Sequence, residues 1–484
     1  MIERSRASFV LAVTVVAAAW SAGHAVGAQP NIILMLSDDQ GWDGLSVAMA
    51  PGDAAGRGDP WHTPCLERMA AQGMRFSCAY APSPVCSPTR ISLQTGRSPA
   101  ALHWTKAAPA EEGHLLAEPR LVKRISADEV TIGEVLRAAG YATAHYGKWH
   151  ISGGGPGDHG YDEHDGDTGN EQAERFTDPN PVDIFGMAER AEAFMQRSRQ
   201  AGKPFFIQLS WNALHAAHNA RQATLAKYAR LTGTDGRDKR TAVYAITEDL
   251  DEGVGRVLDA VDRLGLADTT YVIYMSDNGA GGGGRRGGLS GGKGSVWEGG
   301  IRVPFIVRGP GVEAGSWCHV PIVGYDLFPT FCDWAAVPAD ARPTVLEGGS
   351  IAGLVAGGGQ GQVLRPREEL LFHFPHYQSG HTPHSAIRVG DLKLIRFYED
   401  DSVKLFDLQA DRSERNDLAE ERPDVAAALR TRLDAVLAAV DAQLPTRNPA
   451  GAAGEDAPRR GKGGRRGGRN AETTDRPDKK KGGT

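Results

Sequence analysis

The sequence predicts an α/β fold with a mainly parallel central sheet sandwiched by helices, followed by a smaller C-terminal α+β domain bearing an antiparallel sheet. Three observations predict it. Four continuous apolar runs are typical of strands that are covered on both faces. Helical patterns with one apolar face alternate with these runs, as in layered α/β folds. After about residue 365 the pattern changes to short alternating segments, which indicate antiparallel strands.

Polar side chains follow each apolar run at once. Three runs cover residues 32–36, 205–209 and 271–275, and the fourth lies in the segment "YATAHYGKWH". In open α/β sheets, ligands collect beyond the carboxyl ends of the strands. The residues that follow the four runs are therefore candidates for one shared site: Asp38, Asp39, Lys148, His150, His215, Asp277 and Asn278.

The remaining patterns divide the folded chain into two domains. Residues 241–264 place apolar side chains three and four apart, which defines one apolar face of a helix. Residues 386–408 alternate around a Gly-Asp turn, and residues 423–440 read as a closing amphipathic helix. We expect a larger domain over residues 29–365 and a smaller α+β domain over residues 366–445.

Two terminal segments fall outside these domains. Arg4 and Arg6 precede a short apolar run, and small residues follow up to Ala28, which is typical of a signal peptide over residues 1–28. This run is too short to span a bilayer and no later one is long enough, so we expect export to the periplasm or the extracellular space without a membrane anchor. Residues 446–484 are of low complexity and predict a disordered basic tail.

The charge distribution argues against nucleic acid as a partner. The tail has 11 Lys or Arg and 5 Asp or Glu residues, a net of +6, so the rest of the chain carries −12 of the total of −6. An acidic body of this kind lacks the basic footprint of a nucleic-acid-binding protein. The tail could bind polyanions such as sulfated glycans, or it could simply be solvated.

The chain has five cysteines, an odd count. If one of them is functional, the others could form two disulfides after export, with three possible connectivities. Buried free thiols are the alternative, and the sequence leaves the pairing open. The four cysteines concerned are Cys65, Cys78, Cys318 and Cys332.

The stretch "PVCSPTRISLQTGR" places the remaining cysteine at the mouth of a predicted helix. Ser87 is a good N-cap, Pro88 suits the first helical position, and Gly96 is a stop signal. Cys86 then lies in the positive field of the helix N-terminus, close to the permanent cation Arg90. This arrangement predicts an anion site that contains a reactive side chain.

The strand-end residues supply two complementary kinds of group. One Asp-Asp pair and one Asp-Asn pair offer hard oxygen ligands, which suit Ca²⁺ or Mg²⁺ rather than zinc. Lys293 adds a cation on a glycine-rich loop, with Arg302 nearby. A metal, lysines, histidines and a helix mouth together describe a pocket for a tetrahedral oxyanion. The oxygen ligands are Asp38, Asp39, Asp277 and Asn278, and the cations and proton donors are Arg90, Lys148, His150, His215 and Lys293.

From about residue 30 to residue 420 the chain resembles the type I, formylglycine-dependent sulfatases of the alkaline-phosphatase-like superfamily. "PNIILMLSDDQGWDGL" resembles the opening strand and metal-binding pair of the family, and "CSPTR" fits its C-x-P-x-R maturation signal, followed by S-x-L-x-T-G-R. Later blocks resemble the family in the same order: "GYATAHYGKWH", "SDNG", "GGKGSVWEGGIRVP", "DLFPTF" and "KLFDLQADRSERNDLA".

The resemblance implies a sulfuric ester hydrolase. A maturation enzyme would be a partner and would oxidise Cys86 to formylglycine, whose hydrate is the nucleophile. One Ca²⁺ would be held by Asp38, Asp39, Asp277, Asn278 and the modified Cys86. Sulfate oxygens would be bound by Lys148, His215 and Lys293. Proton transfers would involve Asp277 or a nearby group as base, His215 and Lys293 at the leaving alcohol, and His150 at the second hydroxyl, while Arg90 would orient the hydrate.

Two departures from the family pattern bear on specificity. The loop "NALHAAH" lacks the prolines that often flank the sulfate-binding histidine, so His218 is an alternative to His215. The sequence Leu-Ser-Gly-Gly stands before Lys293, where the family often has an arginine.

Substrate recognition should come from variable loops. "ALHWTK" and "FHFPHYQSGHTPH" are rich in His and aromatic side chains, which stack on sugar rings and bond hydroxyls. We expect a sulfated polysaccharide or its oligosaccharides as substrate, with His376 in a substrate-binding subsite. Alternatively, Phe372, Phe374 and Tyr377 seat the second domain against the first.

Two other functions fit the same residues. One is hydrolysis of phosphate or phosphonate esters on the same scaffold. The other is non-catalytic binding of sulfated glycans, although a binder has no need of a convertible cysteine.

Overall fold

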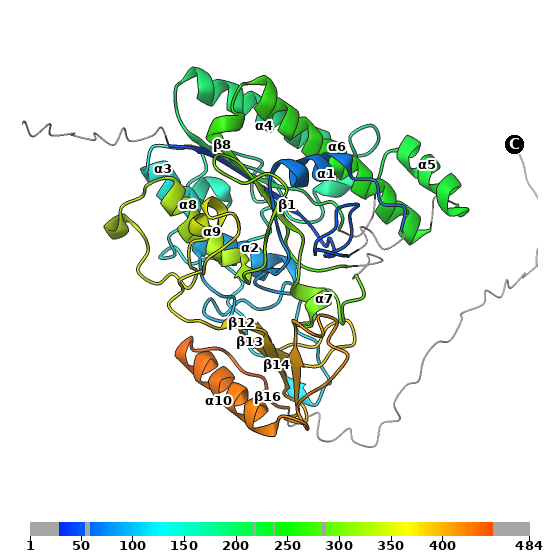
Figure 1. Ribbon diagram of the computed structural model, residues 1–484, viewed down its shortest axis with the longest axis vertical. Helices are drawn as coiled ribbons and strands as arrows, with labels where there is room; N and C mark the ends of the chain where they lie inside the picture. Colours follow the sequence, from blue (N-terminus) through cyan, green and yellow to red (C-terminus); the bar gives the residue numbers. More distant parts are fainter. Residues whose placement is uncertain (1–28, 54–58, 216–218, 236–237, 282–286, 449–484) are drawn as a thin grey trace, which may run out of the picture.

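The computed structural model describes residues 29–53, 59–215, 219–235, 238–281 and 287–448 (Figure 1). The predicted signal peptide, residues 1–28, lies outside the described residues, and so does the predicted tail from residue 449 onward.

An eight-stranded sheet forms the centre of the larger domain, with the strand order β10-β2-β9-β8-β1-β7-β5-β6. Neighbouring strands are parallel, except that β9 runs antiparallel to β8 and β2. The predicted, mainly parallel sheet is therefore confirmed. Its strands are β1 (Asn31–Ser37), β2 (Met74–Phe76), β5 (Ala142–Gly147), β6 (Glu163–His164), β7 (Phe205–Ser210), β8 (Thr270–Ser276), β9 (Phe305–Arg308) and β10 (Ser316–Cys318).

Helices cover both faces of this sheet, because successive side chains of its strands point to opposite sides. From β1, Ile33 and Met35 join a core with α1, α4 and α6, while Ile32 and Leu34 join a second core with α2, α3, α8 and α9. Figure 1 shows the two groups of helices on opposite sides of the sheet. The helices are α1 (Pro64–Gln72), α2 (Cys86–Thr95), α3 (Ile132–Ala138), α4 (Ile184–Gln200), α5 (Gln222–Thr232), α6 (Lys239–Arg263), α7 (Glu298–Ile301), α8 (Leu327–Trp334) and α9 (Ala352–Ala356).

The helix predicted over residues 241–264 is confirmed as α6, whose apolar face is buried. This helix also caps its neighbour α1, whose own N-cap residue, Thr63, makes no side-chain hydrogen bond to the first turn of that helix. Asp251 of α6 accepts hydrogen bonds from the backbone N–H groups of Cys65 (2.9 Å) and Leu66 (2.8 Å). A carboxylate in this place satisfies free N–H groups and complements the helix dipole.

The smaller domain is a four-stranded antiparallel sheet with one long helix, as predicted. Its strands are β12 (Leu370–Phe374), β13 (His384–Val389), β14 (Leu392–Phe397) and β15 (Val403–Asp407), and its helix is α10 (Pro423–Ala439). One face packs on α10, and the other packs on the larger domain. Phe372 and Phe374 are fully buried in this second interface, next to Val85 and Val296. Both aromatic side chains therefore seat the smaller domain against the larger one.

The remaining strands form two small two-stranded sheets. In one, β3 (Ala79–Tyr80) pairs with β11 (Ile322–Val323), and in the other, β4 (Leu116–Ala117) pairs with β16 (Thr446–Arg447). The second pair corrects the predicted tail boundary. Thr446 and Arg447 are ordered against residues 116–117 rather than belonging to a disordered segment. Backbone pairing with a distant strand holds them, which composition alone does not reveal.

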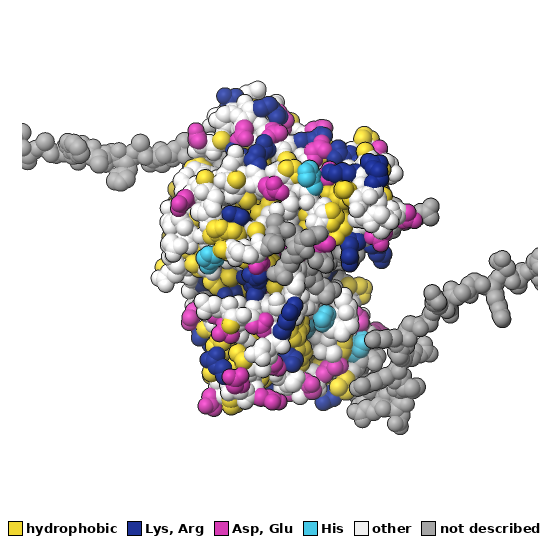
Figure 2. All heavy atoms as spheres, turned by 45° about the vertical axis from the view of Figure 1, so that its right-hand side comes forward, with side chains coloured by type: hydrophobic (Ala, Val, Ile, Leu, Met, Phe, Trp, Pro, Cys, Tyr) yellow, Lys and Arg dark blue, Asp and Glu magenta, His cyan; other side chains and the backbone are white. Residues whose placement is uncertain are grey.

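All five cysteines lie in the described part of the chain, and all are free thiols there. Among the described helices, none combines the length and the apolar character needed to cross a membrane. Figure 2 shows charged side chains of both signs interspersed over one face of the molecule, as is usual for surfaces that face water.

Candidate active site

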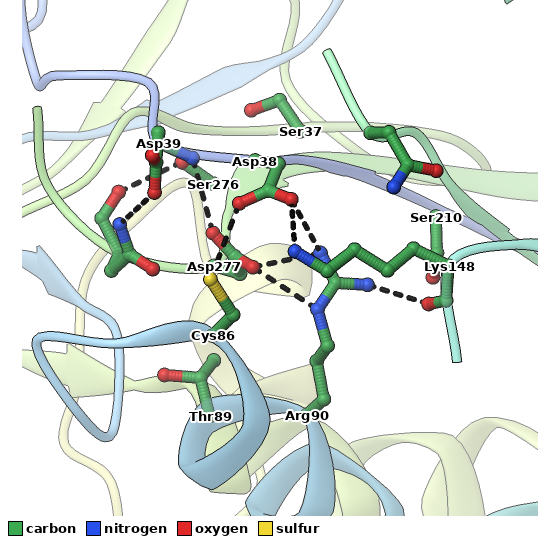
Figure 3. A network of polar contacts seen from close by, with 12 residues as sticks. Ser37, Asp38, Asp39, Cys86, Thr89, Arg90, Lys148, Ser210, Ser276 and Asp277 are labelled. Atoms are coloured by element: carbon green, nitrogen blue, oxygen red, sulfur yellow. Dashed lines mark hydrogen bonds and ion pairs between the residues drawn. The ribbon is translucent and has the colours of Figure 1, made fainter. Parts of the chain in front are cut away.

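The carboxyl ends of β1, β5, β7 and β8 meet the start of α2 at one edge of the sheet (Figure 3). Asp38 follows β1, Lys148 follows β5, and Asp277 follows β8, while Cys86 opens α2. Because parallel neighbours end at the same edge, residues far apart in the sequence come within contact distance. The structure thus brings together the predicted metal ligands and the predicted cations.

Helix α2 begins earlier than the sequence predicts. The N-cap is Val85, in extended conformation and without a side-chain cap, so Ser87 lies inside the first turn and its predicted capping role is wrong. The preceding turn is held instead by Thr89, whose hydroxyl bonds the backbone N–H and carbonyl of Ser83. The predicted end at Gly96 is confirmed, with a left-handed φ of 68°. Cys86 is consequently the first helical residue, where backbone N–H groups are free and the helix dipole is positive.

A compact group of potential metal ligands surrounds this cysteine. One ligand atom each from Asp38, Asp39, Cys86 and Asp277 lies within 4.8 Å of all the others. The Cys86 Sγ lies 3.4 Å from Asp38 Oδ1. The Oδ1 atom of Asn278 is buried and has no hydrogen-bond partner among the described residues. Three carboxylates beside an amide oxygen that accepts no hydrogen bond from the described residues fit a divalent cation that prefers oxygen ligands, such as Ca²⁺.

Buried cations balance the carboxylates. Arg90 donates to Asp277 Oδ2 from Nε (3.1 Å) and Nη2 (2.7 Å), and to the Lys148 carbonyl from Nη1 (2.6 Å). Lys148 Nζ forms an ion pair with Asp38. Lys293 Nζ lies 2.6 Å from Asp39 Oδ1 and 3.3 Å from Cys86 Sγ. The cysteine is therefore surrounded by carboxylates on one side and by a cation on the other.

Unusual backbone conformations direct several of these side chains. Gly147 ends β5 with a φ of +89°, and a Cβ there would lie 2.2 Å from the Ser210 carbonyl oxygen, so only glycine lets the chain turn toward Lys148. Asp39 and His150 adopt positive φ values of 63° and 56°. Such conformations are disfavoured for residues with a side chain and cluster at functional sites.

Burial and neighbouring charges shift the pKa values at the centre. Burial would raise the pKa of Asp38, but Lys148 and Arg90 outweigh it and hold that pKa well below its usual range. Burial and the Asp38 charge raise the pKa of Asp277 to about 6. The same two causes raise the pKa of the Cys86 thiol to about 12. An unmodified Cys86 is therefore protonated at neutral pH and is a poor nucleophile.

The solvent-facing side of the cluster consists of the side chains that are only partly buried: His150, His215 and Lys293. Burial together with Lys148 and Arg90 lowers the pKa of His150 to about 3. Burial also lowers the pKa of His215. Neutral imidazoles at an opening can accept a proton from a bound ligand. The alternative to His215, His218, lies outside the described residues.

A cavity of about 320 Å³ adjoins this opening at the ends of β5, β6 and β7. Three of its lining residues are tied to the cluster. Gly147 directly precedes Lys148, the Thr168 carbonyl accepts from the His150 N–H (2.7 Å), and the Asn212 carbonyl accepts from the His215 N–H (2.8 Å). The rest of its lining includes Asp165, Arg175, Phe176 and Arg190.

The sequence analysis did not identify these cavity residues. Asn212 follows β7 and Asp165 follows β6, so both carry the strand-end signal that led to the other site residues. That signal is weak for Asp165, because β6 is only two residues long and has no apolar run. Phe176 and Arg175 lie in a long connection before α4, where no sequence pattern marks them.

The structure does not bring His376 to the cluster, and we correct its predicted role in substrate binding. Its side chain is fully buried. Its Nδ1 lies 2.7 Å from Glu118 Oε2, and its Nε2 lies 2.7 Å from Thr105 Oγ1. Both ring nitrogens are thus used inside the protein, where Glu118 also accepts from Lys106 Nζ (2.9 Å). The His-rich loop folds inward because this buried carboxylate needs donors.

This buried cluster predicts a pH-dependent stability. Burial would raise the pKa of Glu118, but hydrogen bonds from His376, the Glu111 backbone and Lys106 outweigh it and lower that pKa to about 2. Because the folded pKa lies below the unfolded value, the stabilisation is complete above pH ~4.5 and disappears as the pH falls toward 2. We expect Glu118→Gln to lower the free energy of unfolding by roughly 3 kcal/mol at pH 7 and by about half as much at pH 3.

Urea unfolding of both proteins at the two pH values measures this difference. Glu192→Gln is the control, because its partner Arg263 is more than half exposed and surface pairs contribute little. A cost of Glu118→Gln that is the same at both pH values would contradict the assignment.

The fold and the site define a class of protein: α/β proteins that bring candidate cation ligands and buried cationic side chains together at the ends of parallel strands. Comparison with known families makes this specific. The Sulfatase model matches residues 30–337, and the model of the N-sulphoglucosamine sulphohydrolase C-terminal domain matches residues 292–441. The chain belongs to the sulfatase family, which confirms the resemblance seen in the sequence.

Two relatives from Homo sapiens illustrate the degree of similarity. N-acetylgalactosamine-6-sulfatase is 32% identical over 365 residues, which cover 66% of this chain and 66% of that protein, just under two thirds of its length. Arylsulfatase A is 30% identical over 425 residues, which cover 78% of this chain and 76% of that protein.

A solved structure supports the fold. The structure of Ps i-CgsB superposes with a TM-score of 0.69 at 23% sequence identity, covering 84% of this chain and 93% of that chain. The same protein has been solved in complex with k-i-k-neocarrahexaose. The predicted α/β fold with a C-terminal domain is therefore confirmed.

Proposed function

We propose that this protein hydrolyses sulfate esters of a sulfated oligosaccharide or polysaccharide, with a nucleophile made from Cys86. The observation that carries this proposal is the position of Cys86, whose Sγ lies 3.4 Å from Asp38 Oδ1 and 3.3 Å from Lys293 Nζ. Carboxylates that hold a cation and lysines that bind an anion meet at one convertible side chain. Export and the maturation enzyme stay predictions of the sequence.

Two groups would complete the site, and the residues present fit both. Formylglycine made from Cys86 would supply, as its hydrate, one hydroxyl that attacks sulfur and a second that releases the sulfate. Ca²⁺ would supply charge that stabilises the sulfate oxygens in the transition state. Its ligands would be Asp38, Asp39, Asp277, Asn278 and the modified Cys86.

The chain's own side chains position and stabilise the ester. Lys148 and Lys293 place their ammonium groups beside Asp38 and Asp39, where the oxygens of a bound sulfate would share them. Arg90 holds Asp277 in place through two hydrogen bonds and ties it to the Lys148 backbone. These contacts keep the charges fixed before substrate binds, so little reorganisation is needed during the reaction.

The partly exposed imidazoles would handle protons. His215 lies at the opening with Lys293, where the Lys293 ammonium can donate a proton to the departing alcohol and the N–H of His215 can hydrogen-bond to it. His150 is neutral at physiological pH, since burial and Lys148 lower its pKa to about 3, and its buried Nδ1 has no partner among the described residues. It can therefore accept a proton from the reacting group.

The cavity beside the opening supports a carbohydrate substrate. Its volume of about 320 Å³ lies in the range of small-ligand sites. Phe176 lines it with 39% of its surface exposed, and Arg175 is exposed beside it. An aromatic face suits a sugar ring, and a guanidinium suits an acidic substituent. The name of one similar protein, N-acetylgalactosamine-6-sulfatase, and the complex of another, Ps i-CgsB, with k-i-k-neocarrahexaose support the same substrate class.

A sulfate-release screen tests the activity. The matured protein is incubated with sulfated glycans, their oligosaccharides, an aryl sulfate and matched aryl phosphate and phosphonate esters. We expect sulfate release from at least one glycan and faster turnover of the aryl sulfate than of the phosphorus esters. Turnover of the phosphorus esters alone would favour the related phosphohydrolase function. Glycan binding with no turnover would favour a binding protein.

The cavity gives a specificity prediction. Phe176→Ala should lower kcat/KM for a sulfated oligosaccharide about fivefold to tenfold, because an aromatic contact contributes about 1 kcal/mol. The aryl sulfate, which is too small to fill the cavity as well, should be turned over at an unchanged rate. Leu231→Ala is the matched control, since Leu231 is 60% exposed on α5, away from the cavity lining. An equal loss for both substrates would argue against a sugar subsite here.

A further inference from the structure

The loop that carries Lys293 is held from outside its own domain. It runs from residue 287 to α7 and has no regular structure before Glu298. Within the larger domain, its backbone is bonded at Lys293 N to the Ala280 carbonyl (3.1 Å) and at Gly294 N to the Pro84 carbonyl (2.9 Å). The reach of Lys293 Nζ to Cys86 depends on where this irregular segment is fixed.

Two hydrogen bonds to the smaller domain fix the loop, one on each side of Lys293. Ser290 Oγ donates to the Ser413 carbonyl at 2.7 Å. The backbone N–H of Val296 donates to His384 Nε2 at 2.9 Å. These partners lie on β13 and in the segment after β15, so the sheet of the smaller domain acts as a rigid frame for the loop.

A buried charge network extends the same attachment to α7. Lys393 of β14 is fully buried and lies 2.8 Å from both Glu298 Oε1 and Glu414 Oε1. The Glu414 Oε2 accepts from the Glu298 backbone N–H at 2.7 Å. Arg302, which the sequence places near Lys293, points into this interface and is bonded to Glu298 Oε2 at 3.0 Å. Separating buried ion pairs is strongly unfavourable, because each charge is left without its partner. The network therefore attaches α7 firmly to the smaller domain.

His384 is suited to its role as an acceptor. Its ring is fully buried between the domains, and its Nδ1 lies 2.6 Å from the Thr382 carbonyl, which can only accept. Nδ1 therefore carries the proton and Nε2 is free to accept from Val296. The ring stacks on Phe397, with centroids 5.9 Å apart. Both hydrogen bonds and the stacking set the position of the loop three residues after Lys293.

We propose that His384 is a positioning residue through which the C-terminal domain aligns Lys293 with the reacting group at Cys86. This inference rests on the proposed sulfatase function. It means that the smaller domain is part of the catalytic apparatus, because it holds the loop that carries Lys293. A displacement of about 1 Å at a reacting group can cost roughly 100-fold in rate.

A double-mutant cycle tests the alignment. We expect His384→Leu to lower kcat for an aryl sulfate 10- to 100-fold, and His384→Gln, which keeps an acceptor, to recover most of the loss. In a Lys293→Ala background, His384→Leu should have no further effect, because there is no ammonium group left to align. Additive effects of the two substitutions would overturn the proposal.

A matched histidine controls for stability. His373 of β12 is also buried in the smaller domain and bonded to Ser385 and the Gln443 carbonyl, but it does not contact the Lys293 loop. His373→Leu should lower the thermal unfolding midpoint about as much as His384→Leu while leaving kcat unchanged. Equal losses of kcat in both variants would mean that only stability matters.

Binding of inorganic sulfate separates this inference from the proposed function. Calorimetry should show at least fivefold weaker sulfate binding to His384→Leu than to the wild type, and no such difference in the Lys293→Ala background. If His384→Leu does not fold, Ser290→Ala removes one loop contact and serves in the same cycle. A wild type without sulfatase activity would refute the proposed function, whereas an additive cycle in an active enzyme would refute only the role of His384.

Discussion

Replacement of Cys86 by alanine is expected to abolish sulfate-ester hydrolysis, with a loss of roughly 10⁴-fold or more in kcat. The side chain is 2% exposed at the first position of α2 and touches both Asp38 and Lys293, so it lies between the candidate metal ligands and a sulfate-binding cation. Burial raises the thiol pKa to about 12, so the proposal requires that position 86 be converted rather than remain a thiol.

Mass analysis of the peptide that contains residue 86 shows whether this residue has been converted. Sulfate-release kinetics measure the loss of activity. Cys332→Ala is the control, because Cys332 is an equally buried thiol in the apolar core around α8. That variant should lose some stability through its cavity but keep its kcat. Full activity of a preparation whose residue 86 is entirely unmodified cysteine would refute the formylglycine nucleophile.

Replacement of Asp277 by asparagine is expected to weaken Ca²⁺ binding by at least about 100-fold and to lower kcat by roughly 10³-fold. Asp277 is one of the carboxylates whose oxygens approach within 4.8 Å of one another, and it also fixes Arg90. The amide keeps the shape of the side chain but removes one negative charge from the ligand set. The cation then loses both a strong ligand and part of its electrostatic attraction.

Calorimetric titration with Ca²⁺ and thermal unfolding with and without a chelator test this prediction independently of activity. At a Ca²⁺ concentration 100 times its Kd, the wild type should gain about 2.7 kcal/mol of stability, and the variant far less. Asp259→Asn, at a half-exposed site paired with Arg68, should behave as the wild type. Equal Ca²⁺-dependent stabilisation of wild type and Asp277→Asn would exclude Asp277 as a ligand.

Local sequence patterns predicted the helices and strands that hold the site, because the spacing of apolar residues follows directly from which side of each element is buried. The run over residues 271–275 became β8 and the spacing over residues 241–264 became α6, since each element is covered on the side that its apolar residues define. Predictions that depended on a single local preference were less accurate. Ser87 is not the cap of α2, because Thr89 and Ser83 already hold the preceding turn.

The sequence by itself determined the fold class and the chemistry of the site. Apolar runs that end in Asp, Asn, Lys and His identify strands and place their polar ends at one sheet edge. Only the tertiary structure decided which histidines lie at the opening of the site and which stay inside the protein. His376 pairs with Glu118, while His384 holds the Lys293 loop. The partner of a buried polar group is chosen by three-dimensional contact across hundreds of residues, and no periodicity in the chain encodes that choice.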